Sequence, residues 1–335
     1  MKIPLALVAL IASISANAAS FDCGKAVSAS ELFICSEPKI SALDEVLAKN
    51  YRDSLGGLTS YAIEKVRASQ RAWLAYWPWV CSQTPNRVTL DRDSVKCVIQ
   101  QYEERISELA ITKLLNGKFR VYWVVSFGVM PTEKDDEYGP AKHELKYQQL
   151  DISNPQDPLS RSVLKINEWL KDDRVNWKAS LDNLSDSGSV SSLSTLTEDI
   201  LKRFEHSEFY GHGANHPTST NAASYFSISK NRVLRASDIL DGSRWVDTIV
   251  DIAYRQLEKD LKDSVMLADK KDLEKMIQDI GYWGLKREHL VLNFDVYQVA
   301  PYSEGPQTVK MPWSALSRYL TGYAQQQIPR ITSGK

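Results

Sequence analysis

All four cysteines of this 335-residue chain lie in its first hundred residues, at Cys23, Cys35, Cys81 and Cys97. An even number of cysteines grouped in this way is typical of disulfides in an oxidising compartment. We favour the pairs closest in sequence, Cys23 with Cys35 and Cys81 with Cys97, although spacing leaves the other two pairings open. A zinc site of four thiolates is disfavoured because no C-x2-C pair is present.

The N-terminus has the organisation of a secretory signal. Lys2 precedes the apolar run Ile3–Ile14, and an A-x-A pattern that signal peptidase accepts ends at Ala18. The run is shorter than the roughly 20 residues of a membrane-spanning helix. A lipid anchor on Cys23 is the alternative, but the bulky and acidic residues before it do not fit a lipobox. We therefore expect residues 1–18 to be cleaved off and the mature protein to be periplasmic or secreted, not membrane-spanning.

The composition bounds the function further. The formal net charge is −1 and acidic and basic residues are well mixed. Since no basic stripe is present, we expect no nucleic-acid partner. The length predicts two domains after the signal peptide, and we place their boundary between residues 115 and 116.

Residues 19–115 are predicted to form an all-helical, disulfide-stapled bundle. The Ser28–Glu31 segment has the spacing of a capping box. Pro38 can begin the next helix, whose apolar residues recur at spacings of three and four. The third helix is predicted over residues 61–76, because Pro78 follows.

Tryptophans surround the predicted end of this third helix. Trp73 is expected in the core. Trp77 and Trp79 flank Pro78 at a helix end, where partial exposure is more common than for Trp73, and exposed aromatic side chains are favoured interface anchors. We therefore take Trp77 and Trp79 as candidate binding residues, with core packing as the alternative.

Residues 116–335 are predicted to form an α+β domain with an antiparallel sheet. The serine-rich segment 181–196 is predicted to be mostly loop, and a tight hairpin at 303–306 is expected to join the closing strands. The predicted strands are 119–129, 144–152, 222–229, 289–302 and 307–311, and the predicted helices are 159–171, 245–261, 270–280 and 313–323.

Three of the five histidines lie close together around the segment FYGHGANHPTST, residues 209–220. His206, Glu208, His212 and His216 are zinc ligands by type, which leaves a metal-dependent hydrolase as an alternative.

Gly211 and Gly213, however, disfavour a helix between these histidines. We therefore prefer a tight turn, in which the glycines adopt positive φ and the histidines bond to backbone groups. Tyr210, His212 and His216 are taken as candidate binding residues.

Catalytic and nucleotide-binding motifs are missing from the sequence. It contains no G-x-S-x-G, H-E-x-x-H, Walker or Rossmann pattern. We expect no cofactor, no metal site and no catalytic residue.

The first segment, over residues 20–112, resembles the LprI-type lysozyme inhibitors. The residues that carry this resemblance are Cys23, Glu31, Ile34-Cys35, Leu43-Asp44, Tyr51, Gln70-Arg71-Ala72-Trp73-Leu74, Cys81, Cys97 and the Tyr102–Leu109 helix.

The second segment is similar to the extracytoplasmic C-terminal domain of RsiV-type anti-sigma factors and to the accessory module of PdaC-type deacetylases. The matching segments are Tyr210–His216, Tyr225–Leu240, Phe294–Tyr302, Gly305, Val309, Met311-Pro312 and Leu316.

Both families have members that bind lysozyme, so the resemblance implies a non-catalytic binding protein whose partner is lysozyme or a related cell-wall hydrolase. A peptidoglycan-binding or envelope-stress protein is the alternative.

Overall fold

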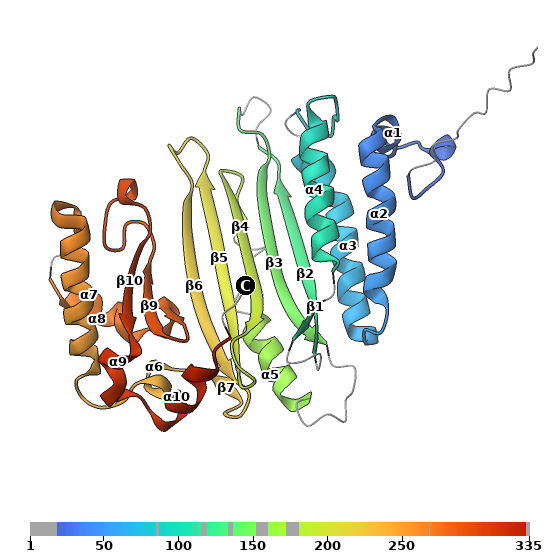
Figure 1. The fold of residues 1–335 in the computed structure, drawn as a ribbon. Helices are drawn as coiled ribbons and strands as arrows, with labels where there is room; N and C mark the ends of the chain where they lie inside the picture. The colour runs from blue at the N-terminus through green and yellow to red at the C-terminus, as the bar shows by residue number, and fades with distance from the viewer. Residues whose placement is uncertain are drawn as a thin grey trace, which may run out of the picture.

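The structure is a computed structural model in which three parts lie side by side (Figure 1). A helical bundle lies at one end, a seven-stranded sheet in the middle, and a three-stranded sheet with its helices at the other end. The residues described are 19–84, 87–110, 112–114, 119–132, 137–151, 160–171, 181–267 and 269–332. The predicted signal peptide, residues 1–18, lies outside them.

The bundle confirms the predicted all-helical segment and both disulfides. The Ser28 side chain accepts from the Glu31 N–H, and the Glu31 side chain accepts from the Ser28 N–H, which is the predicted capping box. Disulfides join Cys23 to Cys35 and Cys81 to Cys97. The helices are α1 (Ala29–Ser36), α2 (Pro38–Leu55), α3 (Ser60–Val80) and α4 (Ser94–Glu108).

The predicted end of the third helix before Pro78 is wrong. Helix α3 continues to Val80 with Pro78 in its last turn, and the Cys81 N–H still donates to the carbonyl of Trp77 at 3.1 Å. Proline at this place removes one helical hydrogen bond rather than many. The disulfide from Cys81 to α4 and the burial of Trp77 hold the final turn in place.

The central sheet keeps its seven strands in sequence order, and its strand pairs are antiparallel apart from the parallel pair β3–β4. Helix α5 (Ser160–Lys171) lies in the connection between these two strands and packs with Phe119, Leu150 and Phe226. The strands are β1 (Thr112–Leu114), β2 (Phe119–Met130), β3 (Ala141–Asp151), β4 (Ser185–Thr195), β5 (Ile200–Gly211), β6 (Thr218–Ser227) and β7 (Arg232–Val233).

The predicted loop over residues 181–196 is also wrong, because most of it is strand β4. The strand is hydrogen-bonded on both sides, to β3 and to β5. Its serines form hydrogen bonds to the neighbouring strand β5. Ser191 Oγ accepts from Arg203 Nε at 2.8 Å, and the hydroxyl oxygens of Ser189 and Ser207 are hydrogen-bonded at 2.9 Å. Such cross-strand contacts outweigh the weak strand preference of serine.

The C-terminal part packs helices on a small antiparallel sheet. Its strands have the order β10–β9–β8, and residues such as Trp283, Leu292 and Leu257 share one core. The elements are α6 (Ala236–Ile239), α7 (Trp245–Leu261), α8 (Lys271–Gln278), β8 (Trp283–Leu285), β9 (His289–Phe294), β10 (Gln307–Pro312), α9 (Trp313–Leu316) and α10 (Gly322–Gln327).

Two predictions about this part need correction. The strand predicted over 289–302 ends at Phe294, because Tyr297 has a φ of 67° and the following backbone forms a turn. The connection to β10 is therefore longer than the tight hairpin predicted at 303–306. The predicted closing helix is divided into α9, a 3-10 turn and α10, because Leu320 bridges to Leu240 and Thr321 caps α10.

Helix α3 covers the edge of strand β2. The Val125 N–H donates to Ser69 Oγ at 3.0 Å, so the helix supplies an acceptor where a strand would otherwise be needed. Tyr76 stacks on Phe127 with ring centroids 4.2 Å apart. Arg120 donates to the carbonyl of Gly56 at 3.0 Å. The bundle and the sheet thus share an interface, and the division at residue 115 stays a prediction about folding units.

We predict that Ser69→Ala lowers the free energy of unfolding by roughly 1–3 kcal/mol, because the buried Val125 N–H then lacks an acceptor. Urea titration followed by tryptophan fluorescence measures this change. Ser60→Ala, at the exposed start of the same helix, is the matched control. An equal and small effect of both substitutions would show that the Ser69 contact is not stabilising.

Candidate functional site

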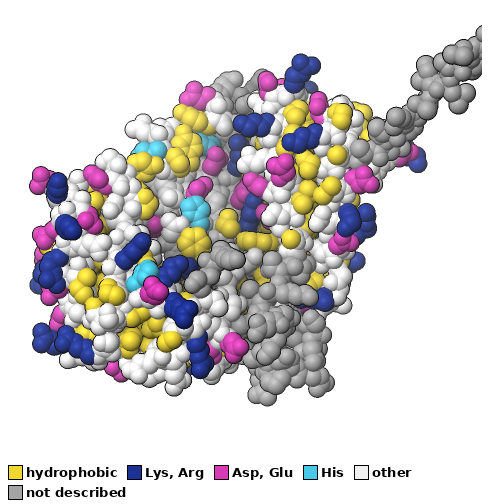
Figure 2. Space-filling view, in the orientation of Figure 1, with side chains coloured by type: hydrophobic (Ala, Val, Ile, Leu, Met, Phe, Trp, Pro, Cys, Tyr) yellow, Lys and Arg dark blue, Asp and Glu magenta, His cyan; other side chains and the backbone are white. Residues whose placement is uncertain are grey.

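One face of the central sheet is open between the bundle and the small sheet. Alternation along β5 places Phe204, His206, Glu208 and Tyr210 on this face. Figure 2 shows the hollow over the middle of the sheet, with acidic, basic and histidine side chains in it. We call this surface the central groove, and its floor consists of Glu144, Asp186, Val190, Phe204, His206, Glu208 and Tyr210.

Helices α3 and α4 form one wall of the central groove. Tyr76, Gln100 and Glu104 from these helices and Glu144 and Glu208 from the sheet line a hollow of about 400 Å³. The Tyr76 hydroxyl donates to Glu144 Oε1 at 2.8 Å, which fixes the wall to the floor. Burial and the neighbouring Glu144 carboxylate raise the pKa of Tyr76, so its hydroxyl keeps its proton.

Carboxylates dominate this end of the central groove. Glu104, Glu144, Asp186 and Glu208 line it, and Lys142 is the one cation among the described residues that line it.

A further cation lies behind these carboxylates. Lys146 Nζ is 3.1 Å from both Glu108 and Glu144 and 3.7 Å from Glu104. Burial opposes the charge of Lys146, but Glu108 and Glu144 outweigh it and raise the pKa of Lys146. Lys142, Lys146 and Arg105, which pairs with Glu108, compensate only part of the negative charge, so this end keeps an excess of negative charge.

The hairpin between β5 and β6 confirms the preferred interpretation of the glycine-rich segment in part. Gly213 has a φ of 85°, as a tight turn requires, whereas Gly211 is not among the residues with positive φ. The side chain of His212 is 6% exposed, and its Nε2 lies 3.3 Å from Asp186. The His212 ring packs against Tyr138 and Tyr210, with centroids at 5.3 and 6.3 Å. His212 therefore supports the hairpin from within, beside the groove.

The other two histidines point to different partners. His216 stacks on Tyr302 with centroids 3.9 Å apart, which joins the hairpin to the β9–β10 connection. His206 is hydrogen-bonded to Asn221 and Glu208 at 2.9 and 3.0 Å. Within the described part of the chain, no three histidine, cysteine or acidic side chains are grouped closely enough to hold a metal ion. Of the four residues considered as zinc ligands, His206 and Glu208 are in contact, whereas His212 contacts Asp186 and His216 contacts Tyr302.

Of the three tryptophans at the end of α3, Trp73 lies in the core as predicted, and Trp77 is the one that does not suit its role as a candidate binding residue. Trp77 is 1% exposed and packs against Trp73 and Tyr102, so it cannot anchor a partner at the surface. Its burial follows from the continuation of α3, which places it one turn after Trp73 on the same face. Trp79 is half-buried near the end of the helix and stays a candidate.

A set of exposed aromatic residues around the hairpin was not predicted from the sequence. Phe209 is 51% exposed, Tyr138 41% and Tyr302 40%. These three residues come from different loops and strand ends, so no local pattern marks them. Together with Tyr210 we call them the aromatic rim: Tyr138 and Tyr210 pack on His212, Tyr302 stacks on His216, and Phe209 lines the acidic end of the groove.

The two parts of the chain match two protein families. Residues 23–109 match the family model described as Lysozyme inhibitor LprI. Residues 237–314 match the model of a protein family of unknown function, DUF3298. The chain therefore combines an LprI segment with a C-terminal DUF3298-like domain, which confirms the predicted succession of two family segments.

Two solved structures are similar to this chain. The crystal structure of a DUF3298 family protein from Bacteroides fragilis has 15% sequence identity and a TM-score of 0.46, and covers 64% of this chain and 98% of that one. The crystal structure of a DUF3298 family protein from Pseudomonas aeruginosa has 13% identity and a TM-score of 0.43, and covers 63% and 98%. No curated protein matches the chain.

Two disulfides and an LprI segment are typical of proteins of the periplasm or the extracellular space. None of the helices in the described ranges is both long and apolar enough to cross a membrane.

We predict that Glu208→Gln lowers the pKa of His206. Hydrogen bonds that the His206 ring donates to Glu208 and then to Asn221 raise this pKa above its ordinary value. A raised pKa in the folded state means that the pair stabilises the protein fully below the unfolded pKa, and that this contribution is lost as the pH rises through the folded pKa. NMR chemical shifts of the imidazole followed against pH measure the change. Glu198→Gln, on an exposed turn, is the control and leaves the His206 pKa unchanged.

Proposed function

We propose that the protein is a non-catalytic inhibitor that binds a lysozyme-type cell-wall hydrolase. The observation that carries this proposal is the LprI match, because the matched segment supplies α3 and α4, the helical wall of the central groove. A binding surface that uses this wall also uses the floor of the sheet. The two parts of the chain therefore act together in this proposal.

The charges and the aromatic rim supply complementary parts of the recognition. Glu104, Glu144 and Glu208 lie at the bundle end of the groove and favour the approach of a basic enzyme. Phe209 and Tyr302 are exposed beside it and can bury apolar area against the partner. Inhibition then follows from occlusion of the substrate cleft, without any chemical step by this protein.

The proposal includes the location of the protein. Cleavage after Ala18 would release a mature chain with a bundle over residues 19–115 and an α+β domain over residues 116–335. Export brings the cysteines into an oxidising compartment, where both disulfides can form. Cell-wall hydrolases act in that same compartment.

A second candidate function is the binding of peptidoglycan itself. It is favoured by Phe204, which is 40% exposed on the floor of the groove and could stack on a sugar ring. Co-sedimentation with purified sacculi, without added hydrolase, separates this function from the first. Retention on sacculi with no effect on any lysozyme would favour the second candidate.

We predict that the double substitution Glu104→Lys and Glu208→Lys weakens hydrolase binding roughly tenfold or more, because attraction at the acidic end becomes repulsion. Lysozymes of the c, g and i types are titrated against the mature protein by calorimetry and by an activity assay.

Glu103→Lys is the control for the Glu104 charge reversal, since Glu103 lies on α4 but is exposed near Lys39, outside the groove. It should leave the affinity nearly unchanged. The proposed function fails if the wild-type protein forms no complex with any lysozyme and inhibits none.

A further inference from the structure

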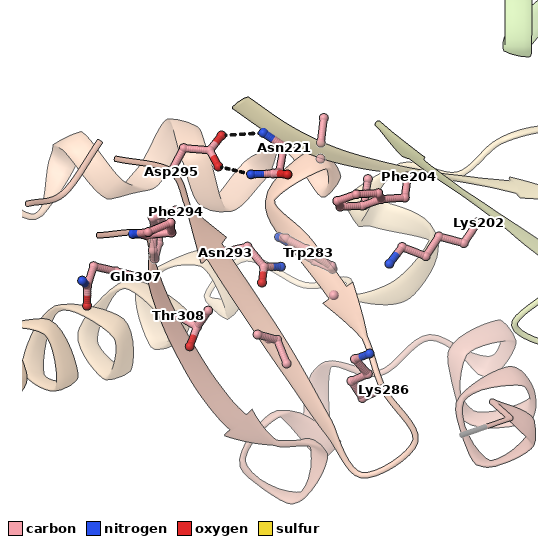
Figure 3. Close-up of a pocket in the computed structure, with 16 residues that line it drawn as sticks. Lys202, Phe204, Asn221, Trp283, Lys286, Asn293, Phe294, Asp295, Gln307 and Thr308 are labelled. Carbon is pink, nitrogen blue, oxygen red and sulfur yellow. Dashed lines mark hydrogen bonds between the residues drawn. The ribbon is translucent and has the colours of Figure 1, made fainter. Parts of the chain in front are cut away.

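A second hollow lies at the other end of the central groove, between strands β5 and β6 and the small sheet. It has a volume of about 240 Å³. Phe204, Ala222 and Pro306 supply exposed apolar surface, and Asn293 and Thr308 supply polar groups (Figure 3). Trp283 borders the hollow but is fully buried. The volume is below the roughly 300 Å³ at which sites for drug-sized ligands begin, so the hollow suits a ligand of about the size of an amino acid or a peptide terminus.

Two lysines, Lys202 and Lys286, line one end of this hollow. Figure 3 shows Lys202 and Lys286 beside Trp283, on the side away from Asp295. No carboxylate of the described residues lies within ion-pair distance of either ammonium group. Burial, and then the charge of Lys286, lower the pKa of Lys202. Two cations held close together without an anion are electrostatically unfavourable, and a bound anion would relieve this repulsion.

Among the described residues that line the hollow, the one carboxylate already has hydrogen-bond partners. Asp295 accepts from the backbone N–H of Asn221 at 2.8 Å and from its side-chain amide at 2.9 Å (Figure 3). These bonds turn Asp295 toward strand β6 and away from the lysines. The hollow is therefore polarised, with positive charge at one end and a satisfied carboxylate at the other.

The hydroxyl of Thr195 lies beyond the two lysines, in an adjoining hollow. Lys202 and Lys286 also line this adjoining hollow of about 650 Å³, together with Thr195, Arg287 and Glu288. The Thr195 hydroxyl is buried and has no hydrogen-bond partner among the described residues. In this adjoining hollow the charges of Arg287 and Glu288 offset each other, so the two lysines again leave an excess of positive charge. A buried hydroxyl without a partner is costly unless a ligand or water bonds to it.

We propose that this hollow binds a small carboxylate with an apolar or aromatic body, its carboxylate between Lys202 and Lys286 and its body against the exposed ring of Phe204. The carboxylate could belong to a free organic acid or to the C-terminus of a peptide. Both sources present the same group, and the hollow is open enough to admit the end of a chain. This site is separate from the acidic end of the groove and does not depend on hydrolase binding.

The test is calorimetric titration of the full mature protein with N-acetyl-alanyl-alanine, with its C-terminal amide, and with benzoate. We expect the free peptide acid or benzoate to bind and the amide to bind at least roughly tenfold more weakly, because it lacks the charge that the lysines recognise. The tighter of the two acids identifies the source.

Lysine variants test whether binding of the acid depends on the two lysines of the hollow. Lys202→Gln and Lys286→Gln should each weaken the binding of the acid roughly tenfold. Lys259→Gln, on the exposed surface of α7, should leave it unchanged. Melting curves of the variants verify that they are folded. The proposal is overturned if neither acid binds at millimolar concentration, if acid and amide bind equally, or if Lys259→Gln has the same effect as the other two.

Lysozyme is titrated in parallel, without any of these acids. Inhibition that survives in Lys202→Gln while acid binding is lost separates this site from the inhibitory surface. Loss of lysozyme inhibition in the Glu104 and Glu208 variant, with acid binding intact, separates them in the other direction.

Discussion

The interface between helix α3 and the edge of strand β2 determines where every other part of the molecule can lie. An uncovered strand edge presents unpaired N–H and carbonyl groups that invite association with other chains. Here Ser69 accepts from the Val125 N–H, and Tyr76 stacks on Phe127 beside it. Beyond the short pairing of β1 with residues 119–121, the edge is closed by a disulfide-linked bundle rather than by another strand. This arrangement sets the bundle beside the sheet, where its helices can form a wall of the central groove.

The open face of the sheet is a consequence of its topology. Parallel strands need a crossover connection, and the connection between β3 and β4 contains α5, which covers one face. On the other face, between the bundle and the small sheet, β5 carries Phe204, His206 and Glu208, which are polar or partly exposed. Acidic groups gather beside the bundle and lysines beside the small sheet. One surface thus has two ends with opposite charge preferences.

Much of the fold could be predicted from the sequence, because local signals decide local structure. The Ser28–Glu31 capping box and the helix starting at Pro38 are decided within a few residues. Each disulfide joins the cysteines closest in sequence, 12 and 16 residues apart. Strand β4 was missed because its serines are stabilised by neighbouring strands, which a local pattern does not show. The sites were predicted less well. Trp77 is buried because the helix passes through Pro78, and Glu104, Glu144 and Glu208 come together only through the tertiary fold.

The parallel pair β3–β4 divides the sheet into two halves, each made of strands that are consecutive in the chain. The first half, β1–β3, is preceded directly by the bundle that covers its outer edge. Since the N-terminal part of a chain is synthesised first, this half can bury its edge and close its disulfides before β4 exists. The edge of β3 that pairs with β4 then remains unpaired until β4 has been synthesised. The order of segments along the chain therefore limits how long an aggregation-prone strand edge is exposed during biosynthesis.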